Sequence, residues 1–247
     1  MKTVIVIPAR YKSSRFPGKP LVKLLGKPMI QWVAELSAKA VGKKNVYIAT
    51  DDQRISDAVI ELGYEAVMTS ENCLTGTDRL AEFAQKVDAD IYINVQGDEP
   101  LVNSDDIKKV IDTKIAHPNE VINGYAIMGK DEDPNSVNIP KVIFTDDKLL
   151  VYMSRQALPG FKDPKDAPSE YYKQVCIYAF NRQELLAYGS YNKKSTLEQY
   201  EDIEIIRFLE WGQTIRMVQT RPNSLAVDTP EDLSKVEAAL RGAMSAS

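Results

Sequence analysis

Short apolar runs alternate with amphipathic stretches along the first half of the chain. Runs with the length and composition of buried strands occupy four segments, at 3–7, 45–50, 64–69 and 90–97. Apolar residues recur at helical spacing in the stretches between and after them, at 28–40, 51–63, 75–87 and 103–116. This alternation predicts parallel strands joined by right-handed helical crossovers, in a sheet with helices on both faces.

The rhythm changes after about residue 121. Strand-like segments then follow one another with little helix between them, at 121–128, 141–145, 149–154 and 173–180. The pattern ends with a helix, a strand and a helix, at 197–212, 214–220 and 229–243. The last helix can open with Thr229 as its N-cap and Pro230 at its first position. We therefore expect a single α/β domain, with a mostly parallel sheet and an antiparallel extension.

Composition and charge are those of an ordinary globular protein. The 247 residues are 44% hydrophobic and 27% charged, with a net charge of −4, so no general attraction to nucleic acid or to an anionic membrane is expected. The apolar runs fall short of the roughly 20 residues that span a bilayer. The two cysteines, Cys73 and Cys176, show neither metal-ligand spacing nor a disulfide framework. A cytoplasmic enzyme is the default expectation.

The first strand runs directly into a stiff cationic loop, IPARYKSSRFPGKPL at 7–21. Ligands of doubly wound sheets bind beyond the carboxyl ends of the strands, which is where this loop is expected. Backbone amides with Arg10, Arg15 and Lys19 could hold a polyphosphate, and Gly18 would permit close approach. A solvated basic loop is the alternative. The loop matches neither GxGxxG nor GxxxxGKS/T, which argues against a nicotinamide site and against a P-loop.

Two aspartates could hold a divalent cation near this loop. Asp98 follows the fourth strand, at the same edge of the sheet, and Asp228 lies in LAVDTPEDL. Mg²⁺ takes one or two carboxylates, and phosphate oxygens and water complete its coordination. Asp98 could equally cap a strand end, and Asp228 could belong to the start of the last helix. Cations after the first strand, with carboxylates at the same edge, fit metal-assisted nucleotidyl transfer.

Eight motifs along the chain carry a family resemblance. They are IPARYKSSRFPGKPL, GKPMIQ, ATDD, TGTDRL, NVQGDEP, YMSR, LEQYEDIEIIR and VDTPEDL. In this order and at about this spacing they resemble the CMP-Kdo synthetases, the 3-deoxy-manno-octulosonate (Kdo) cytidylyltransferases of lipopolysaccharide or capsule synthesis. The resemblance covers essentially the whole chain. It implies a Rossmann-like nucleotidyltransferase fold, a homodimer, CTP and a sugar acid as substrates, Mg²⁺ as cofactor and pyrophosphate as product.

The resemblance also implies roles for individual residues. Those that would bind CTP are Pro8, Ala9, Arg10, Arg15, Lys19, Thr75, Gly76, Thr77 and Arg79. Those that would face the sugar acid are Gln96, Arg155, Gln174, Glu198 and Glu201. Asp98 and Asp228 would bind Mg²⁺, and Lys19, Arg10 and Asp98 would act in catalysis. About 1–120 would form the CTP-binding half, about 121–220 the sugar-binding and dimerisation half, and 221–247 the closing helix.

Several positions depart from the family pattern. Cys73 and Leu74 stand where family members carry a histidine and a polar residue. Gln174 and Cys176 stand where histidine and glycine are usual. Because the nucleotide and metal residues match, the resemblance is closer for CTP chemistry than for Kdo itself. The alternatives are 8-amino-Kdo, another 2-keto-3-deoxy sugar acid or a phosphonate and, in another class, a non-catalytic regulatory homologue that binds a nucleotide.

Overall fold

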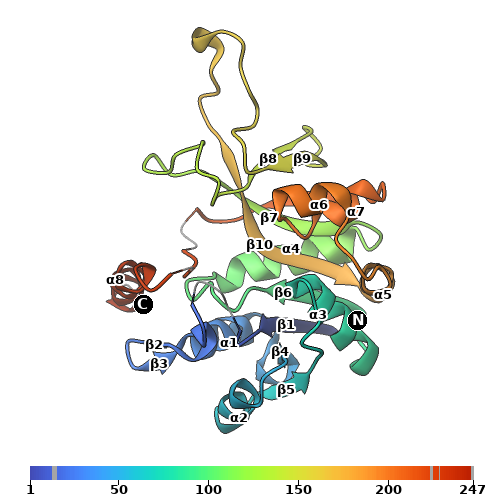
Figure 1. Cartoon of the computed structure of the whole chain (residues 1–247), viewed down its shortest axis with the longest axis vertical. Coiled ribbons are helices and arrows are strands. Elements are labelled where there is room, and N and C mark those ends of the chain that lie inside the picture. Colours follow the sequence, from blue (N-terminus) through green and yellow to red (C-terminus); the bar gives the residue numbers. More distant parts are fainter. Residues whose placement is uncertain (13–15, 223–224, 228, 246–247) are drawn as a thin grey trace.

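One mixed sheet runs through the protein and joins both halves of the chain (Figure 1). The computed structural model describes residues 1–12, 16–222, 225–227 and 229–245. In these residues the sheet has the strand order β11-β7-β10-β6-β1-β4-β5. The strands are β1 (Thr3–Ala9), β4 (Val46–Thr50), β5 (Glu65–Met68), β6 (Ile91–Val95), β7 (Val121–Ile127), β10 (Tyr172–Asn181) and β11 (Ile215–Gln219).

The sheet is mostly parallel, as the alternating pattern predicted. β1 pairs in parallel with β4 and β6, β4 with β5, and β7 with β11. β10 runs antiparallel to both of its neighbours, β6 and β7. A hairpin of β8 (Lys141–Phe144) and β9 (Leu150–Ser154) extends the sheet from β10. A further small hairpin joins β2 (Lys23–Leu24) to β3 (Lys27–Pro28). The antiparallel extension is therefore β10 with the β8–β9 hairpin.

Helices cover both faces of the sheet, which explains its continuous apolar strands. All five residues of β6 are buried. One face packs against α1 (Met29–Val41), α2 (Gln53–Glu61) and α4 (Ser104–Ala116). The other packs against α3 (Gly76–Lys86), α5 (Arg182–Gly189) and α7 (Ile206–Glu210). Apolar residues on both faces of each strand are what a doubly covered sheet requires.

Two predicted helices differ from the structure. The segment predicted as one helix over 197–212 is two short helices, α6 (Thr196–Glu201) and α7. Asp202 ends α6 with φ 49°, a left-handed conformation that an aspartate tolerates better than most residues. The closing helix, α8 (Asp232–Ser245), begins after Thr229 rather than at it. The backbone N–H of Thr229 donates instead to the Asp232 carboxylate, at 2.8 Å.

The closing helix packs beside the start of α1, away from the sheet. Val236 and Leu240 of α8 are buried in a small cluster with Met29 and Trp32 of α1. In Figure 1 the connection between β9 and β10 projects far beyond the rest of the chain. Short 3₁₀ turns occur at Lys19–Leu21, Lys43–Asn45 and Pro164–Asp166. Within the described ranges, every helix is too short or too polar to span a bilayer.

Candidate active site

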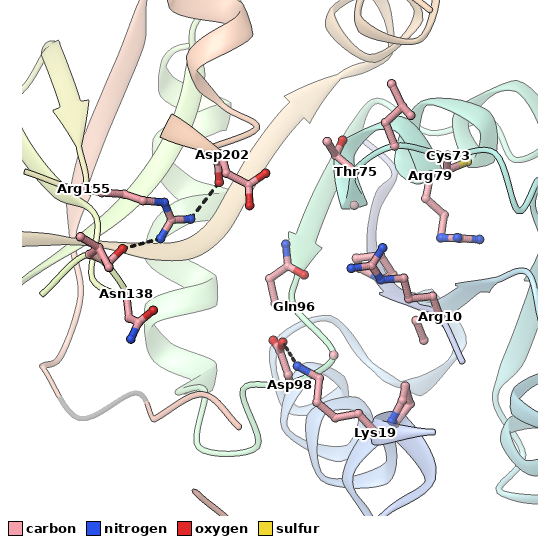
Figure 2. A pocket seen from close by; sticks show the side chains of 17 residues that line it. Arg10, Lys19, Cys73, Thr75, Arg79, Gln96, Asp98, Asn138, Arg155 and Asp202 are labelled. Carbon is pink, nitrogen blue, oxygen red and sulfur yellow. Dashed lines mark hydrogen bonds and ion pairs between the residues drawn. The ribbon is translucent and has the colours of Figure 1, made fainter. Parts of the chain in front are cut away.

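A cleft with two adjoining lobes lies at the carboxyl ends of β1 and β6. Their volumes are about 670 and about 500 Å³. We call the larger the cationic lobe and the smaller the acidic lobe, after the charges that line them. Figure 2 shows Arg10 and Lys19 on one side of the cationic lobe and Arg155 on the other, with Gln96 and Asp98 between. Residues that line both lobes are Leu74, Thr75, Gly76, Gln96, Asp98, Asn138, Arg155 and Asp202.

Most of the predicted CTP residues line the cationic lobe. They are Pro8, Ala9, Arg10, Lys19, Thr75, Gly76 and Arg79. Arg15 of the same group, and Asp228 of the predicted metal pair, lie outside the described residues. Thr77 is fully buried behind the lining, and its backbone N–H donates to Glu204. Part of the loop after β1 therefore lines a cavity at the carboxyl end of the strand, where the loop was expected, and its binding of CTP stays a prediction.

Lys19 and Asp98 form an ion pair at the floor of the cleft. The Lys19 ammonium donates to Asp98 Oδ2 at 2.6 Å and to the Val227 carbonyl at 2.8 Å. The Asp98 side chain is 28% exposed, so its carboxylate remains open to the cleft. The Val227 N–H donates in turn to the Asp98 carbonyl at 2.9 Å. These bonds hold a cation and a carboxylate from different parts of the chain at one point of the cleft.

Thr75 and Gly76 begin the first turn of α3, where the two lobes meet. Thr75 is the N-cap of α3, and its hydroxyl accepts from the Asp78 N–H. A Cβ on Gly76 would lie 3.3 Å from Gln96 Nε2 and from Pro8, and 3.4 Å from Glu204 Oε2. Those distances are shorter than most contacts of a real Cβ, so the turn passes close to its neighbours because position 76 is glycine.

Arg155 presents a cation to both lobes. Its guanidinium donates to the carbonyls of Val137, Glu201 and Asp202. Carbonyl groups orient the guanidinium without cancelling its formal charge. A fork-shaped donor held in this way suits the bidentate recognition of a carboxylate or a phosphate.

The acidic lobe carries more carboxylates than cations. Among its described lining residues, the acids are Asp98, Glu99, Glu132, Asp202 and Glu204, and the cations are Arg155, Lys173 and Lys194. Two of the cations are paired within the lobe, Lys173 with Glu132 and Lys194 with Asp202. Gln174 lines the same lobe, where its amide donates to Asn123 Oδ1 at 3.2 Å and to the Tyr178 hydroxyl at 3.3 Å.

The structure places two predicted sugar residues behind the cleft. Glu198 is fully buried, and both of its carboxylate oxygens accept from Arg207. Glu201 accepts from the Ser154 hydroxyl at 2.6 Å and from the Arg155 N–H at 2.8 Å. Neither residue lines a lobe, so the structure does not agree with the prediction that they face the sugar acid. Both lie behind the lining residues and support them. Their bonds to Arg207, Ser154 and the Arg155 backbone hold both carboxylates there.

Asp202 and Glu204 are lining residues that the sequence interpretation missed. Glu204 Oε2 accepts from the Thr77 N–H at 2.9 Å, and Oε1 accepts from Gln96 at 3.1 Å. It therefore bridges the N-terminus of α3 to the end of β6. The available signal was the charge pattern EDIE at 201–204, in which four residues hold three carboxylates next to an apolar helix face. That pattern does not show that Asp202 adopts a left-handed conformation.

The chemistry of the cationic lobe fits Mg²⁺ with bound phosphates better than a metal cluster held by protein alone. In the described ranges, no three His, Cys, Asp or Glu side chains gather around one point. Asp98 supplies one open carboxylate, and Mg²⁺ commonly takes one or two together with phosphate oxygens and water. Cys73 also lines the lobe, but burial raises the pKa of its thiol to about 11, so it is a poor nucleophile at neutral pH.

Replacing Glu204 with glutamine should remove a pH-dependent cost in stability. Burial raises the pKa of Glu204 above its ordinary value of 4.5, so the folded protein binds this proton more tightly than the unfolded chain. The free energy of unfolding therefore falls as pH rises from the unfolded pKa through the raised folded pKa. We expect E204Q to be at least as stable as the wild type at neutral pH, with this advantage lost in acid. Thermal unfolding measured across pH tests this; an E204Q that is less stable than wild type by the same margin at every pH contradicts it.

Comparison with known proteins identifies the family. Residues 4–215 match the cytidylyltransferase family. The chain is 41% identical over 243 residues to the 8-amino-3,8-dideoxy-manno-octulosonate cytidylyltransferase of Shewanella oneidensis, covering 96% of this chain and 98% of that protein. It is 42% identical over 247 residues to the 3-deoxy-manno-octulosonate cytidylyltransferase of Trichlorobacter lovleyi, with the same coverage.

A solved structure agrees with these relatives. The CMP:2-keto-3-deoxy-manno-octonic acid synthetase complexed with CTP superposes with a TM-score of 0.90 at 39% identity, covering 98% of this chain and 99% of that one. The shared fold and the nearly complete coverage of both chains agree with the resemblance that the motifs carry along the whole chain. The protein is an enzyme that belongs to the cytidylyltransferase family.

Proposed function

We propose that this enzyme transfers CMP from CTP to the anomeric hydroxyl of Kdo and releases pyrophosphate. The observation that carries the proposal is the two-lobed cleft, with phosphate-binding cations in one lobe, carboxylates in the other, and Asp98 where they join. Relatives named for the same reaction on Kdo and on its 8-amino analogue support it.

CTP fits the cationic lobe by charge. Arg10 and Lys19 lie on the side of the lobe formed by the loop after β1, and both are residue types that bind phosphate. Thr75 and Gly76, at the start of α3, offer the N-terminal end of a helix dipole to a negatively charged group. A solved relative whose structure holds CTP supports this assignment.

The sugar acid fits the junction and the acidic lobe. Arg155, which lines both lobes, would receive its carboxylate through charge-assisted hydrogen bonds. Gln96, Gln174 and Asn138 offer amide donors and acceptors of the kind that recognise sugar hydroxyls. This arrangement would set the anomeric hydroxyl beside the α-phosphorus of a nucleotide in the cationic lobe.

The chemistry is an in-line displacement at the α-phosphorus. The anomeric oxygen forms a bond to that phosphorus as the bond to the bridging α–β oxygen breaks, and the hydroxyl proton leaves to water. Lys19 and Arg10 would stabilise the charge that gathers on the departing pyrophosphate. Asp98 is the described residue that would hold Mg²⁺, which supplies charge neutralisation to the phosphates when bound. Positioning two substrates in one cleft can itself lower the barrier by roughly 7–11 kcal/mol.

A second candidate substrate is 8-amino-Kdo. The excess of carboxylates in the acidic lobe favours it, because an ammonium group at the far end of the sugar would gain attraction there. Glu132 shows that a carboxylate of this lobe can accept from an ammonium group, since it already accepts from the Lys173 side chain. Kdo itself would offer a neutral hydroxyl to the same groups.

A substrate panel tests the proposed function. Pyrophosphate release would be followed with CTP, Mg²⁺ and either Kdo, 8-amino-Kdo, another 2-keto-3-deoxy sugar acid or a phosphonate. The proposal predicts the highest kcat/KM for Kdo. A higher value for 8-amino-Kdo would move the assignment to the second candidate, and turnover of a phosphonate alone would overturn both.

Replacing Gln174 with histidine should change the choice between these two acids. A histidine in the acidic lobe adds a group that is partly cationic near neutral pH, which opposes an ammonium on the substrate. We expect Q174H to raise the ratio of kcat/KM for Kdo over 8-amino-Kdo by about tenfold, the order that one pocket contact can supply. The KM for CTP should not change. A flat substrate ratio would show that Gln174 does not read this part of the sugar.

A further inference from the structure

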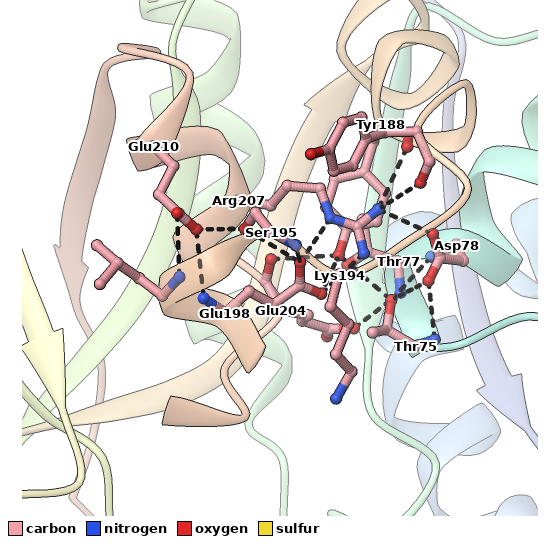
Figure 3. A network of polar contacts seen from close by, with 12 residues as sticks. Thr75, Thr77, Asp78, Tyr188, Lys194, Ser195, Glu198, Glu204, Arg207 and Glu210 are labelled. Atoms are coloured by element: carbon pink, nitrogen blue, oxygen red, sulfur yellow. Dashed lines mark hydrogen bonds and ion pairs between the residues drawn. The ribbon is translucent and has the colours of Figure 1, made fainter. Parts of the chain in front are cut away.

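We propose that Asp78 and Arg207 are positioning residues that hold the nucleotide turn, residues 75–77, in register with the acidic lobe. The inference rests on the proposed function, because it concerns how the two substrate sites of that reaction are aligned. Neither side chain lines a lobe. Their effect would pass through the backbone of the turn (Figure 3).

Asp78 fixes the turn from within α3. Its Oδ2 accepts from the backbone N–H of Thr75 at 2.9 Å and from the Thr75 hydroxyl at 2.8 Å. The Thr75 hydroxyl accepts in return from the Asp78 N–H at 3.1 Å, which completes a capping box. The orientation of Thr75, which lines both lobes, therefore depends on where the Asp78 carboxylate is held.

Arg207, on α7, holds that carboxylate from a distant part of the chain. The guanidinium of Arg207, which is fully buried, donates to Asp78 Oδ1 at 3.1 Å. It also forms a bidentate pair with Glu198, at 2.7 and 2.8 Å, and lies 3.7 Å over the ring of Tyr188. Burial alone would lower the pKa of Arg207, but its hydrogen bonds to Glu198 raise the pKa above the usual value. The cation is therefore permanent, and its position is set by the packing of α5, α6 and α7.

A second set of bonds joins the same two parts. The Tyr188 hydroxyl donates to the Glu204 carbonyl at 3.2 Å and lies 3.3 Å from the Thr75 hydroxyl. The Glu204 carboxylate accepts from the Thr77 N–H at 2.9 Å. Residues 202–204 line the acidic lobe, so each of these bonds ties the nucleotide turn to the wall of the sugar site.

Close packing makes the turn sensitive to small shifts. The space beside Gly76 is too narrow for a side chain, since an added Cβ would lie 3.3–3.4 Å from Gln96, Pro8 and Glu204. A change of a few tenths of an ångström at Asp78 would therefore move the turn against Gln96 or away from it. Since in-line transfer needs both substrates in a narrow range of geometry, such a shift would affect CTP binding and turnover together.

A second helix cap in this protein provides a matched control. Asn181 and Glu184 form the same capping box at α5, and the Glu184 carboxylate accepts from the buried Lys114 ammonium at 2.7 and 2.9 Å. Both caps thus place a carboxylate at the third helical position, bonded to the N-cap and to a buried cation. The α5 cap does not line the cleft among the described residues.

The experiment compares D78N with E184Q. In each variant an NH2 group replaces one carboxylate oxygen and the negative charge is lost, so either the buried cation or the N-cap loses an acceptor and the ion pair is lost. We expect both to lower the thermal midpoint. Only D78N should lower the affinity for CTP, by about tenfold or more as measured by isothermal titration calorimetry. Only D78N should lower kcat as well. Equal CTP affinities for D78N and wild type, or the same loss in E184Q, would overturn the proposal.

The alignment also predicts coupling between the two ligands. Kdo should bind the wild type more tightly when CMP occupies the cationic lobe. The ratio of the Kdo affinities with and without CMP should fall toward one in D78N. Arg207→Lys, which keeps the charge but loses the bidentate fork, should reduce the same ratio if it folds. CTP affinity is measured without turnover, so the positioning role can fail while the proposed reaction stands. A wild type that binds CTP and uses no sugar acid would reject the proposed reaction alone.

Discussion

Replacing Asp98 with asparagine should lower kcat by about a hundred- to a thousandfold at saturating Mg²⁺, while the fold is retained. Asp98 is the open carboxylate where the two lobes join, and its one described side-chain partner is the Lys19 ammonium. The amide has nearly the same shape but no charge, so it would neither pair fully with Lys19 nor hold a divalent cation. The loss should fall on turnover because the group lies in a cleft rather than in the core.

The control for this variant is Asp57→Asn. Asp57 lies exposed on α2, where its side chain accepts from Gln53. We expect D57N to retain wild-type kcat, and both variants to unfold within about 4 °C of the wild type, the shift that roughly 1 kcal/mol produces in a protein of this size. Near-normal turnover of D98N would show that neither metal nor Lys19 depends on this carboxylate.

Replacing Lys19 with alanine should lower kcat/KM for CTP by about a hundredfold or more. The Lys19 side chain is only 16% exposed, and its ammonium is fixed by the Asp98 carboxylate and the Val227 carbonyl. A cation held in this way loses little freedom when it binds a phosphate, which makes it more effective than a mobile surface lysine. Lys19→Arg should recover part of the loss, because it restores the charge with a different shape.

Lys12→Ala is the matched control because Lys12 belongs to the same basic loop. Its side chain is 83% exposed and pairs with Glu71 at the surface. If the loop acts only by its overall charge, K12A and K19A should lower kcat/KM for CTP to a similar degree. If the loop acts through specific contacts, K12A should behave as wild type in steady-state kinetics with varied CTP. Equal effects of the two substitutions on kcat/KM for CTP would favour the alternative that this is a solvated basic loop.

The sequence predicts the layered fold well because the relevant signals are local. Buried strands and helical spacing each depend on residues within a few positions of one another. The place of β10 between β6 and β7 is not local, since it depends on pairing between residues 45 or more positions apart. The pattern therefore indicates an antiparallel extension without its position in the sheet.

The site is predicted in part for the same reason. Loops that follow strands can be placed at one edge of the sheet, which brought Arg10, Lys19 and Asp98 together correctly. Glu198 was assigned to the sugar by the family resemblance alone, and no local pattern shows that its carboxylate pairs with the buried Arg207 instead. The pair of Asp78 and Arg207 joins positions 129 apart, and neither residue has a local pattern that names the other as its partner.

Phosphorus NMR of the enzyme with CTP, Mg²⁺ and Kdo tests the central claim most directly, because it reports which phosphorus–oxygen bond is broken. The account predicts that the three triphosphate signals disappear together, replaced by one phosphodiester signal of a CMP-sugar and one signal of pyrophosphate. The change should require the sugar acid and should be absent in D98N. Unchanged CTP with every acid of the panel, or conversion to CDP and inorganic phosphate, would contradict it.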